Sequence, residues 1–467
     1  MSSRVSSPAS HRHIPLPLLA AQLPRLNARW RERYPVLLES AAEASPLNRY
    51  DVLLAGPAEC LTLDAHGRLT GPAGDARGFL AALDRWWSAE RQRERIETPF
   101  AGGWFLYLGY ELAAEVEPTL ALTTGTRPKA LAWRMHGAVV FDRQTGSGWL
   151  AAETAHAAQL EAQLGHDLHA LGDETDGDEV TDVGESSGAA IDLPIDEEPP
   201  ERYLAGVEAT LAAIGRGDVY QANLSRRWRA RLKPGVDATD IYRRLRRANP
   251  APFAGVAHLP GFSVLSSSPE RLLRVENGTA STRPIAGTRP RGQTRTSDES
   301  LRSELRLNEK EQAEHVMLVD LERNDLGRVC RAGTVRVDEY MTIESYTHVH
   351  HIVSNVRGEL REDVTPGQAI AAVFPGGTIT GCPKIRCIQL LAELEREPRE
   401  AYTGSMGYLR LDGDLDLNIL IRTITIAGDA LEFRTGAGIV ADSQPQAELA
   451  ETRAKARGLL RALGAPG

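Results

Sequence analysis

Residues 402–440, "YTGSMGYLRLDGDLDLNILIRTITIAGDALEFRTGAGIV", decide the fold. They divide into three apolar runs rich in Leu, Ile and Thr, and the turns between the runs consist of Gly and Asp. Turns this short join antiparallel neighbours, because parallel strands need a crossover of a dozen or more residues. A long helix is predicted directly afterwards, over 447–463. Antiparallel strand runs mixed with helices indicate an α+β protein.

The sequence before this stretch continues the pattern. A helix is predicted over 201–214 and ends at Gly215 and Gly217. The next run, "VYQANLSRRW" (219–228), alternates, and its polar face carries a Gln, an Asn and a Ser. Such a face is either solvent-exposed or lines a site. An Asn-Gly pair at 277–278 predicts a hairpin turn.

Two further helices are predicted. One spans 297–321 and is capped by Ser297 or Asp298. The other begins near Cys382, with Pro383 in its first turn, where the missing N–H costs nothing.

The composition indicates a large globular protein in a reducing compartment. The 467 residues, 42% hydrophobic, are sufficient for one extended domain or two ordinary ones. Four cysteines in this length suggest no disulfide framework, so we expect a cytoplasmic protein. No run approaches the ~20 apolar residues of a membrane span, and the N-terminus lacks the features of a signal peptide.

The net charge of −9 is concentrated in one segment. Residues 171–200 contain eleven acids and no Lys or Arg, so the acidity belongs to a solvated stretch. We therefore predict an N-terminal region over 14–165, a disordered acidic linker over 166–200 and a catalytic domain over 201–467. Nucleic-acid binding is not expected, because no basic stripe with interleaved aromatics is present.

Two pairs of carboxylates share a helix face. Glu311 and Glu314 are three apart in "EKEQAEHVMLVDLERND", and Glu448 and Glu451 are three apart in the last helix, close to Lys455. Taken alone, each pair is more typical of a solvated helix face. Two such pairs on separate helices suit Mg²⁺, which prefers oxygen ligands and keeps waters that a substrate can share.

Glycine-rich segments supply candidate anion-binding sites. "FPGGTITGCPK" (374–384) and "RTGAGIV" (434–440) place backbone N–H groups at turns and a helix entry, and Arg422 and Lys455 add positive charge. The first segment is not a nucleotide loop, because Cys-Pro separates the last Gly from the Lys. Together with the carboxylates, these features predict a small dianionic or polycarboxylate substrate bound with Mg²⁺.

Seven motifs in order resemble those of the chorismate-utilising enzymes. This family includes anthranilate synthase component I, aminodeoxychorismate synthase component I, and the isochorismate and salicylate synthases. The resemblance covers roughly 201–460 and implies two antiparallel β-sheets packed face to face as a sandwich, with helices outside. The motifs are "SPERLL", "RPIAGTRPRG", "EHVMLVDLERNDLGRV", "PGGTITGCPK", "YTGSMGYL", "ILIRT" and "GAGIVADS".

The resemblance also implies residue roles. Glu270 would be the general acid that protonates the leaving 4-hydroxyl group. Mg²⁺ would bind to Glu314 and Glu451, with Glu311 and Glu448 holding its waters. The carboxylates of chorismate would be held by Arg422, Lys455 and the backbone at Gly436 and Gly438, with Tyr402 contacting the enolpyruvyl arm. The residues expected to line the ring are Ile285, Ala286, Gly287, Thr288, His351 and Thr378.

A shorter match lies in the N-terminal half. "YPVLLES" (34–40) together with "NPAPF" (249–253) resembles the pair that frames a tryptophan pocket in the aminating members of the family. The implied pocket residues are Leu38, Glu39, Ser40, Pro252 and Phe253.

Gln221 favours ammonia as the nucleophile. Family members that add water carry a lysine base at this position, and a Gln is unable to take a proton from water. The sequence contains no glutaminase motif, so ammonia would come from a separate glutamine amidotransferase.

The product depends on two conflicting observations. "YTGSMGYL", "DLNILIRT" and Phe253 favour amination at C4, which gives 4-amino-4-deoxychorismate for 4-aminobenzoate and folate synthesis. Ala286 favours the alternative, anthranilate, because many C4-aminating members carry a nucleophilic lysine there. A non-catalytic regulatory subunit is the third alternative, and the intact Glu270, Glu314 and Glu451 argue against it.

Overall fold

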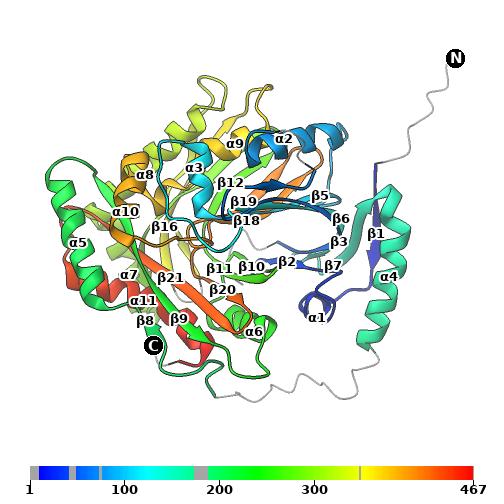
Figure 1. Ribbon diagram of the computed structural model, residues 1–467, viewed down its shortest axis with the longest axis horizontal. Coiled ribbons are helices and arrows are strands. Elements are labelled where there is room, and N and C mark those ends of the chain that lie inside the picture. Colours follow the sequence, from blue (N-terminus) through cyan, green and yellow to red (C-terminus); the bar gives the residue numbers. More distant parts are fainter. Residues whose placement is uncertain (1–9, 42–48, 73–75, 173–187, 347–348, 466–467) are drawn as a thin grey trace.

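The computed structural model describes residues 10–41, 49–72, 76–172, 188–346 and 349–465. In this part of the chain the strands pair in antiparallel fashion and form two layers (Figure 1). Helices lie outside both layers, so the α+β prediction is confirmed.

The first sheet carries one wall of the site. β15 (Arg336–Ser345) pairs with β16 (Val349–Glu359), and β14 (Ile285–Pro290) and β13 (Thr279–Arg283) both pair with β16 as well. From β13 the order of pairing continues through β12 (Arg271–Glu276), β19 (Leu415–Asn418), β18 (Ser405–Arg410) and β5 (Gly103–Leu108). The turn between β12 and β13 is the predicted Asn277–Gly278 hairpin, and both residues have positive φ.

The second sheet carries the opposite wall. At one end β1 (His11–Leu16) pairs with β7 (Ser147–Glu153), and two long strands separate this pair from β2 (Val36–Glu39). From β2 the order of pairing continues through β10 (Phe253–Leu259), β11 (Phe262–Ser268), β20 (Thr423–Ala427), β21 (Ala430–Ile439) and β9 (Gln221–Arg231), with the short β8 (Asp196–Glu197) and β17 (Gly381–Cys382) on β9.

Two long strands join the sheets. β3 (Tyr50–Leu63) and β6 (Ala130–Asp142) pair along their whole length, with a register shift between Pro57 and Cys60, and β4 (Leu69–Thr70) extends β3. The first half of β6 pairs with β5 and its second half with β7. Side chains of the two sheets meet between the layers: the rings of Tyr107 and Phe262 are 5.5 Å apart.

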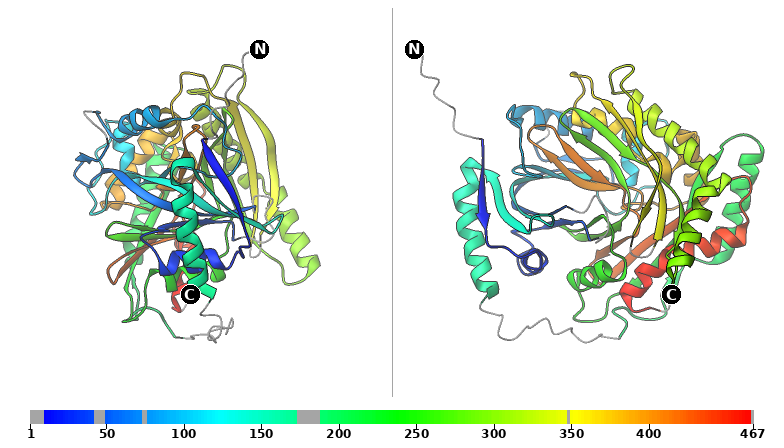
Figure 2. Two further views of the ribbon diagram at one scale, coloured as in Figure 1. Left: turned by 90° about the vertical axis from the view of Figure 1, so that its right-hand side faces the viewer. Right: turned by 180° about the vertical axis from the view of Figure 1, so that it is seen from behind.

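Helices cover the outer faces, as the views in Figures 1 and 2 show. α2 and α9 pack on the first sheet, whereas α1, α4, α6 and α11 share a hydrophobic core with the second, and α5 and α10 pack on β9. The bounds are α1 (Gln22–Arg29), α2 (Phe79–Glu90), η1 (Tyr110–Leu112), α3 (Ala113–Val116), α4 (Thr154–Gly172), α5 (Pro200–Gly215), α6 (Ala238–Ala248), α7 (Arg295–Leu307), α8 (Glu309–Gly327), α9 (Pro366–Val373), η2 (Gly377–Ile379), α10 (Lys384–Glu395) and α11 (Pro445–Leu463).

The predicted single helix over 297–321 is wrong, because the chain forms two helices there. Thr294 caps α7 in a capping box with Ser297, and α7 ends at Leu307. The side chain of Asn308 then accepts the N–H of Glu311 at 3.0 Å and starts α8. An Asn side chain competes with the helix for backbone N–H groups, which explains the break.

The predicted linker is partly ordered. α4 continues to Gly172, and Ala190 and Ile191 are fully buried. Residues 173–187, which hold most of its acids, lie outside the described residues. The regions on either side of the linker also share both sheets, since β2 pairs with β10 and β5 with β18. The division at the linker therefore does not separate two structural units.

Candidate active site

The predicted general acid, Glu270, lies in the short connection between β11 and β12, and it is only 4% exposed. The hydroxyl of Thr378 in η2 donates to its Oε1 at 2.7 Å, and the backbone N–H of Ile285 also donates. Burial raises the pKa of Glu270 to about 7, although these hydrogen bonds and the charge of Arg422 oppose the rise. Near neutral pH, Glu270 therefore has a proton to give to a leaving group.

His351 lies on β16, opposite a bulge in β14. Its Nδ1 is 3.0 Å from Oγ1 of Thr288 and 3.4 Å from the carbonyl oxygen of Gly287. Gly287, with a φ of 62°, sits where the pairing register shifts between Ala286 and Thr288. Burial lowers the pKa of His351 to about 3, and the charge of Arg422 lowers it further, so the ring is neutral at pH 7.

The polar face of β9 lines the second wall. Gln221 and Ser225 are buried, so this face of the strand is not exposed to solvent, and its role in lining a site stays a prediction. A Cβ at Gly436 would lie 2.7 Å from both Oδ1 of Asn223 and the hydroxyl oxygen of Tyr402. A Cβ at Gly438 would overlap with the amide nitrogen of Gln221. Glycine at both positions lets β21 approach these polar groups closely.

Two amide oxygens on this wall lack partners. Oε1 of Gln221 and Oδ1 of Asn223 are buried, and neither has a hydrogen-bond partner among the residues that the structure describes. A buried acceptor without a partner costs ~1–3 kcal/mol, so the pair is suited to accept N–H donors from a bound molecule.

Two cations complete the assembled part of the site. Arg422, in the connection before β20, is half-buried, and its charge acts on both Glu270 and His351. Lys455 on α11 also acts on both residues, and its Nζ donates to the carbonyl oxygen of Gly436 at 3.0 Å. Two cations beside a buried acid form an environment suited to a ligand with two carboxylates.

The four predicted magnesium ligands are not brought together. Glu311 forms an ion pair with Arg289 at 3.2 Å, and Glu451 forms one with Lys455 at 2.8 Å. Across the described ranges, no three His, Cys, Asp or Glu side chains are grouped so that they hold a metal ion. The carboxylates are of the kind that Mg²⁺ prefers, and the magnesium site stays a prediction.

Sequence reasoning missed several residues that support the site. Glu395 accepts hydrogen bonds from the N–H and hydroxyl of Ser225, both at 2.9 Å, and pairs with Arg399 and Arg434, which holds β9 in place. Glu322, on α8, is 6% exposed, and burial together with the negative charges of Asp325 and Glu270 raises its pKa to about 8. Asn223 is signalled by the alternation of β9, whereas Glu322 and Glu395 look like solvated helix residues in the sequence.

A separate cavity of about 520 Å³ lies where the tryptophan pocket is predicted. All five predicted residues, Leu38, Glu39, Ser40, Pro252 and Phe253, contribute to its lining, together with Tyr50, Met406 and Tyr408. The Glu39 carboxylate itself accepts from Tyr242 and Arg246, both at 2.6 Å, so α6 already satisfies it.

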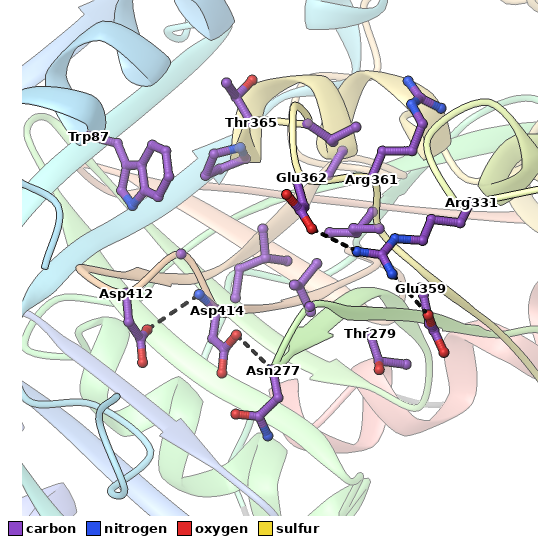
Figure 3. Close-up of a pocket in the computed structure, with 18 residues that line it drawn as sticks. Trp87, Asn277, Thr279, Arg331, Glu359, Arg361, Glu362, Thr365, Asp412 and Asp414 are labelled. Atoms are coloured by element: carbon purple, nitrogen blue, oxygen red, sulfur yellow. Dashed lines mark hydrogen bonds and ion pairs between the residues drawn. The ribbon is translucent and has the colours of Figure 1, made fainter. Parts of the chain in front are cut away.

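Figure 3 shows another cavity, of about 480 Å³, which contains none of the predicted site residues. Trp87 forms one side of it, and Arg331 and Glu362 form an ion pair at 3.0 Å on the other. Asp414 accepts the N–H of Asn277 at 2.9 Å, and Arg410 pairs with Asp414, so these charges are already satisfied.

The family is established by comparison with known proteins. A model described as chorismate binding enzyme matches residues 35–461. The chain belongs to this family. It is 43% identical over 368 residues to an anthranilate synthase component I-like protein of Synechocystis, across 78% of this chain and 73% of that protein. It is 40% identical over 396 residues to aminodeoxychorismate synthase component 1 of Bacillus subtilis, across 82% of each.

A solved structure supports the fold of this chorismate-binding enzyme. Anthranilate synthase component I from Streptococcus pneumoniae superposes with a TM-score of 0.77 at 30% identity, covering 89% of this chain and 93% of that one. The family prediction and the two-sheet prediction are thereby confirmed. Relatives named for two different products are both present, so the comparisons establish a chorismate-utilising enzyme and leave its product to the residues of the site. No helix in the described part of the chain is long and apolar enough to cross a membrane.

Proposed function

We propose that this chorismate-binding enzyme adds ammonia to chorismate. The observation that carries the proposal is the pair of buried amide oxygens on Gln221 and Asn223, which have no partner among the described residues. Ammonia donates N–H groups to such acceptors, is already nucleophilic, and needs only to be oriented. Activating water requires a base, and neither amide side chain accepts a proton at neutral pH.

The chemistry that we propose for Glu270 is the loss of the 4-hydroxyl group. A C–N bond forms, the C4–O bond breaks, and the oxygen leaves as water with the proton of Glu270. The new ammonium group then releases a proton, so the reaction needs no oxidant or reductant. The hydrogen bond from Thr378 fixes the orientation of the Glu270 carboxyl, and Arg422 and Lys455 offset the negative charge that the site gains.

We further propose that the product is 4-amino-4-deoxychorismate, made with ammonia from a glutamine amidotransferase subunit. The motifs around Tyr402 and Arg422 and the residue Phe253 support amination at C4. The 40% identity to an aminodeoxychorismate synthase component 1 is consistent with it. The synthesis of 4-aminobenzoate and folate would consume this product, in the cytoplasm, where the four cysteines stay free; all four are free in this structure.

Anthranilate is the second candidate, and Ala286 favours it. This residue is 8% exposed on β14, between Ile285 and Gly287, so its small side chain belongs to the wall that carries Glu270 and His351. No amine is available at position 286 to attack C2 of the ring, and C4 amination would then proceed without that covalent step.

One incubation separates the two products. The purified chain is incubated with chorismate, Mg²⁺ and ammonium at alkaline pH, and the products are separated by chromatography. A product that a C4-type lyase converts to 4-aminobenzoate supports the proposal. Anthranilate with an equal amount of pyruvate supports the second candidate, and no turnover even with a glutaminase partner supports a regulatory subunit.

Two ligands remain predictions. The four carboxylates Glu311, Glu314, Glu448 and Glu451 suit Mg²⁺ in chemistry but are not assembled around a common point in the described residues. Tryptophan is proposed for the 520 Å³ cavity on the basis of its aromatic lining, with Phe253, Tyr50 and Tyr408 as walls.

A further inference from the structure

One buried arginine contacts two segments of the candidate site. Arg399 lies in the connection between α10 and β18, and only 3% of it is exposed. Its Nη2 donates to the carbonyl oxygen of Asn223 on β9 at 2.6 Å. Its Nη1 donates to the carbonyl oxygen of Ile379 in η2 at 3.3 Å. A single guanidinium therefore joins β9 to the turn that carries Thr378.

Each of the two joined segments carries a group that the proposed reaction uses. Oδ1 of Asn223 is one of the two amide oxygens without a partner among the described residues. Thr378, next to Ile379, donates to Oε1 of Glu270 at 2.7 Å. The segments also meet in the backbone, where the N–H of Asn223 donates to the carbonyl oxygen of Thr380 at 3.0 Å. Arg399 adds two hydrogen bonds to this junction, so the spacing between the amide oxygen and the acid depends on it.

The guanidinium of Arg399 is itself held in one orientation. Its Nε and Nη2 donate to the two carboxylate oxygens of Glu395 at 2.9 and 2.7 Å, which is a bidentate pair. Its central carbon lies 4.8 Å from the ring centroid of Tyr110 and 5.5 Å from that of Tyr402. A buried ion pair contributes little net stability, because desolvation offsets the attraction. What this pair supplies is a donor group of fixed direction.

The backbone that places Arg399 is strained. Glu400 has a φ of 50°, and Thr403 has a φ of 62°, which is an outlier for a β-branched residue. Glu111 of η1 holds this backbone from the N-terminal half of the chain, since it accepts the N–H of Arg399 at 2.8 Å and that of Glu400 at 3.1 Å. Strain of this kind persists only where the surrounding contacts enforce it, and it gathers at functional sites.

We propose that Arg399 is a positioning residue, which holds the amide oxygens of β9 and the general acid at the separation that amination needs. It acts through Asn223 and through Thr378. A guanidinium suits this role because it donates along several fixed directions at once, whereas a lysine ammonium is a point charge on a flexible stem. The catalytic consequence rests on the function proposed above. The link between the two segments is a property of the folded chain and is measurable without substrate.

The first test follows hydrogen–deuterium exchange by mass spectrometry in the wild type and in Arg399→Lys. The peptides compared cover residues 221–225 and 377–380. Lysine keeps the positive charge beside Glu395 but does not reach both carbonyl oxygens together. We therefore expect exchange in both peptides to be roughly 10-fold faster in the variant, as the loss of a hydrogen bond from a charged donor implies.

The matched control is Arg134→Lys, in a part of the chain that contains no predicted site residue. Arg134 on β6 is also 3% exposed. It donates to the carbonyl oxygens of Gly103 and Met135 at 3.2 and 2.7 Å. It also pairs with Glu90 and Glu153 at 2.7 and 2.8 Å. The control should lower the melting temperature as Arg399→Lys does and leave exchange in both peptides unchanged.

The second test measures the kinetics with chorismate and ammonium. A displacement of ~1 Å at a positioning residue costs about 10²-fold in rate. For Arg399→Lys we expect the KM for ammonia to rise roughly 10-fold and the KM for chorismate to change less than about twofold, because Arg422 and Lys455 are the groups proposed to hold the carboxylates. A purely structural role would reduce the amount of active enzyme and leave both KM values unchanged.

The outcomes separate this inference from the proposed function. Faster exchange in neither peptide, or in only one, overturns the inference whatever the enzyme makes, and so does an active Arg399→Lys with an unchanged KM for ammonia. Faster exchange in both peptides, in a protein whose wild type makes no aminated product, supports the link and overturns the proposed function.

A second variant decides the question if Arg399→Lys does not fold. Glu395→Gln keeps the shape of the side chain and removes the charge that orients the guanidinium. The decisive peptide is then 377–380, because among the described residues its link to Glu395 runs through Arg399. Faster exchange there supports the inference, and unchanged exchange overturns it.

Discussion

The wall around Glu270 and the carboxylates on α8 and α11 are built in opposite ways. Glu270 and His351 are buried, Thr378 and Ile285 are half-buried, and all four come from strands or tight connections. Hydrogen bonds of 2.7 Å from Thr378 to Glu270 and 3.0 Å between Thr288 and His351 fix the two buried side chains. Glu311 and Glu451 project from helices, and each pairs with a cation. The Glu270 carboxyl is already oriented for proton transfer, whereas the Glu311 and Glu451 carboxylates are occupied by their ion pairs.

The difference shows what each kind of scaffold does. Neighbouring strands hold groups at fixed spacing, and burial excludes water, so a raised pKa persists without ligand. The Glu451 side chain is 49% exposed and that of its partner Lys455 is 42% exposed. An ion pair this open is worth ~0–1 kcal/mol, so a ligand with stronger interactions separates it at little cost.

The largest effect is expected at the assembled wall. Glu270→Gln keeps the shape and the hydrogen bond from Thr378 but has no proton to give, so kcat should fall roughly 10²–10⁴-fold, the usual range for a general acid. Steady-state kinetics with ammonium measures this. Glu276→Gln, at the exposed end of β12, is the control. Retention of full turnover by Glu270→Gln would remove the acid from the mechanism.

The wild-type pH profile sharpens the same point. A carboxyl whose pKa is raised to about 7 is protonated below that pH, so kcat/KM should decline as the pH rises through this value. The rates must be compared at equal concentrations of free ammonia, because ammonium loses its proton as the pH rises. An alkaline limb that is the same in Glu270→Gln would mean that another group limits the rate.

A smaller loss is expected at the unassembled carboxylates. Glu314→Gln should lower turnover roughly 10²-fold at low Mg²⁺ through weaker metal binding, with partial recovery as Mg²⁺ is raised. The measurement is a Mg²⁺ titration of the rate, and Glu299→Gln on the exposed face of α7 is the control. If the chain turns over equally well in excess EDTA, the metal prediction is wrong.

The substitution at Gln221 is expected to change which product forms rather than how fast chorismate is consumed. Gln221→Lys introduces a base beside Gly438, so the share of water-addition product should rise ~10-fold relative to aminated product. Product ratios by chromatography measure this. Gln312→Lys, on α8 and outside the β9 wall, is the control. An unchanged ratio would show that this side chain does not select the nucleophile.

The smallest effect on turnover is expected at the 520 Å³ cavity. Phe253→Ala removes an aromatic wall that also stacks under Arg271, 4.7 Å from the ring centroid. Tryptophan affinity, measured by calorimetry, should fall roughly 10-fold, which corresponds to ~1.4 kcal/mol. Turnover with ammonium should change less than twofold. Tyr340→Ala, at an exposed strand position, is the control. The pocket prediction fails if the wild type binds no tryptophan.

Much of the fold was predictable because it depends on local patterns. The helices α5, α10 and α11 and the hairpin at Asn277 follow from apolar period, glycine stops and turn chemistry. The break at Asn308 was not predicted, because the apolar period runs on through it and only the side-chain cap ends α7. The sequence also did not predict that the regions on either side of the linker share both sheets. Pairing such as that of β5 with β18 joins residues about 300 positions apart in the chain.

The sequence alone determined the family, because its ordered motifs match those of the chorismate-binding enzymes, and it supplied the candidate residues of the site. The identities of Gln221 and Ala286, on which the predicted nucleophile and product depend, are read directly from the sequence. Only the tertiary structure decided that Glu270 is buried and that the amide oxygens of Gln221 and Asn223 lack partners among the residues it describes. The physical reason is that the pKa and hydrogen-bonding state of a side chain depend on water exclusion and neighbouring charge, and these arise only when distant strands and helices pack together.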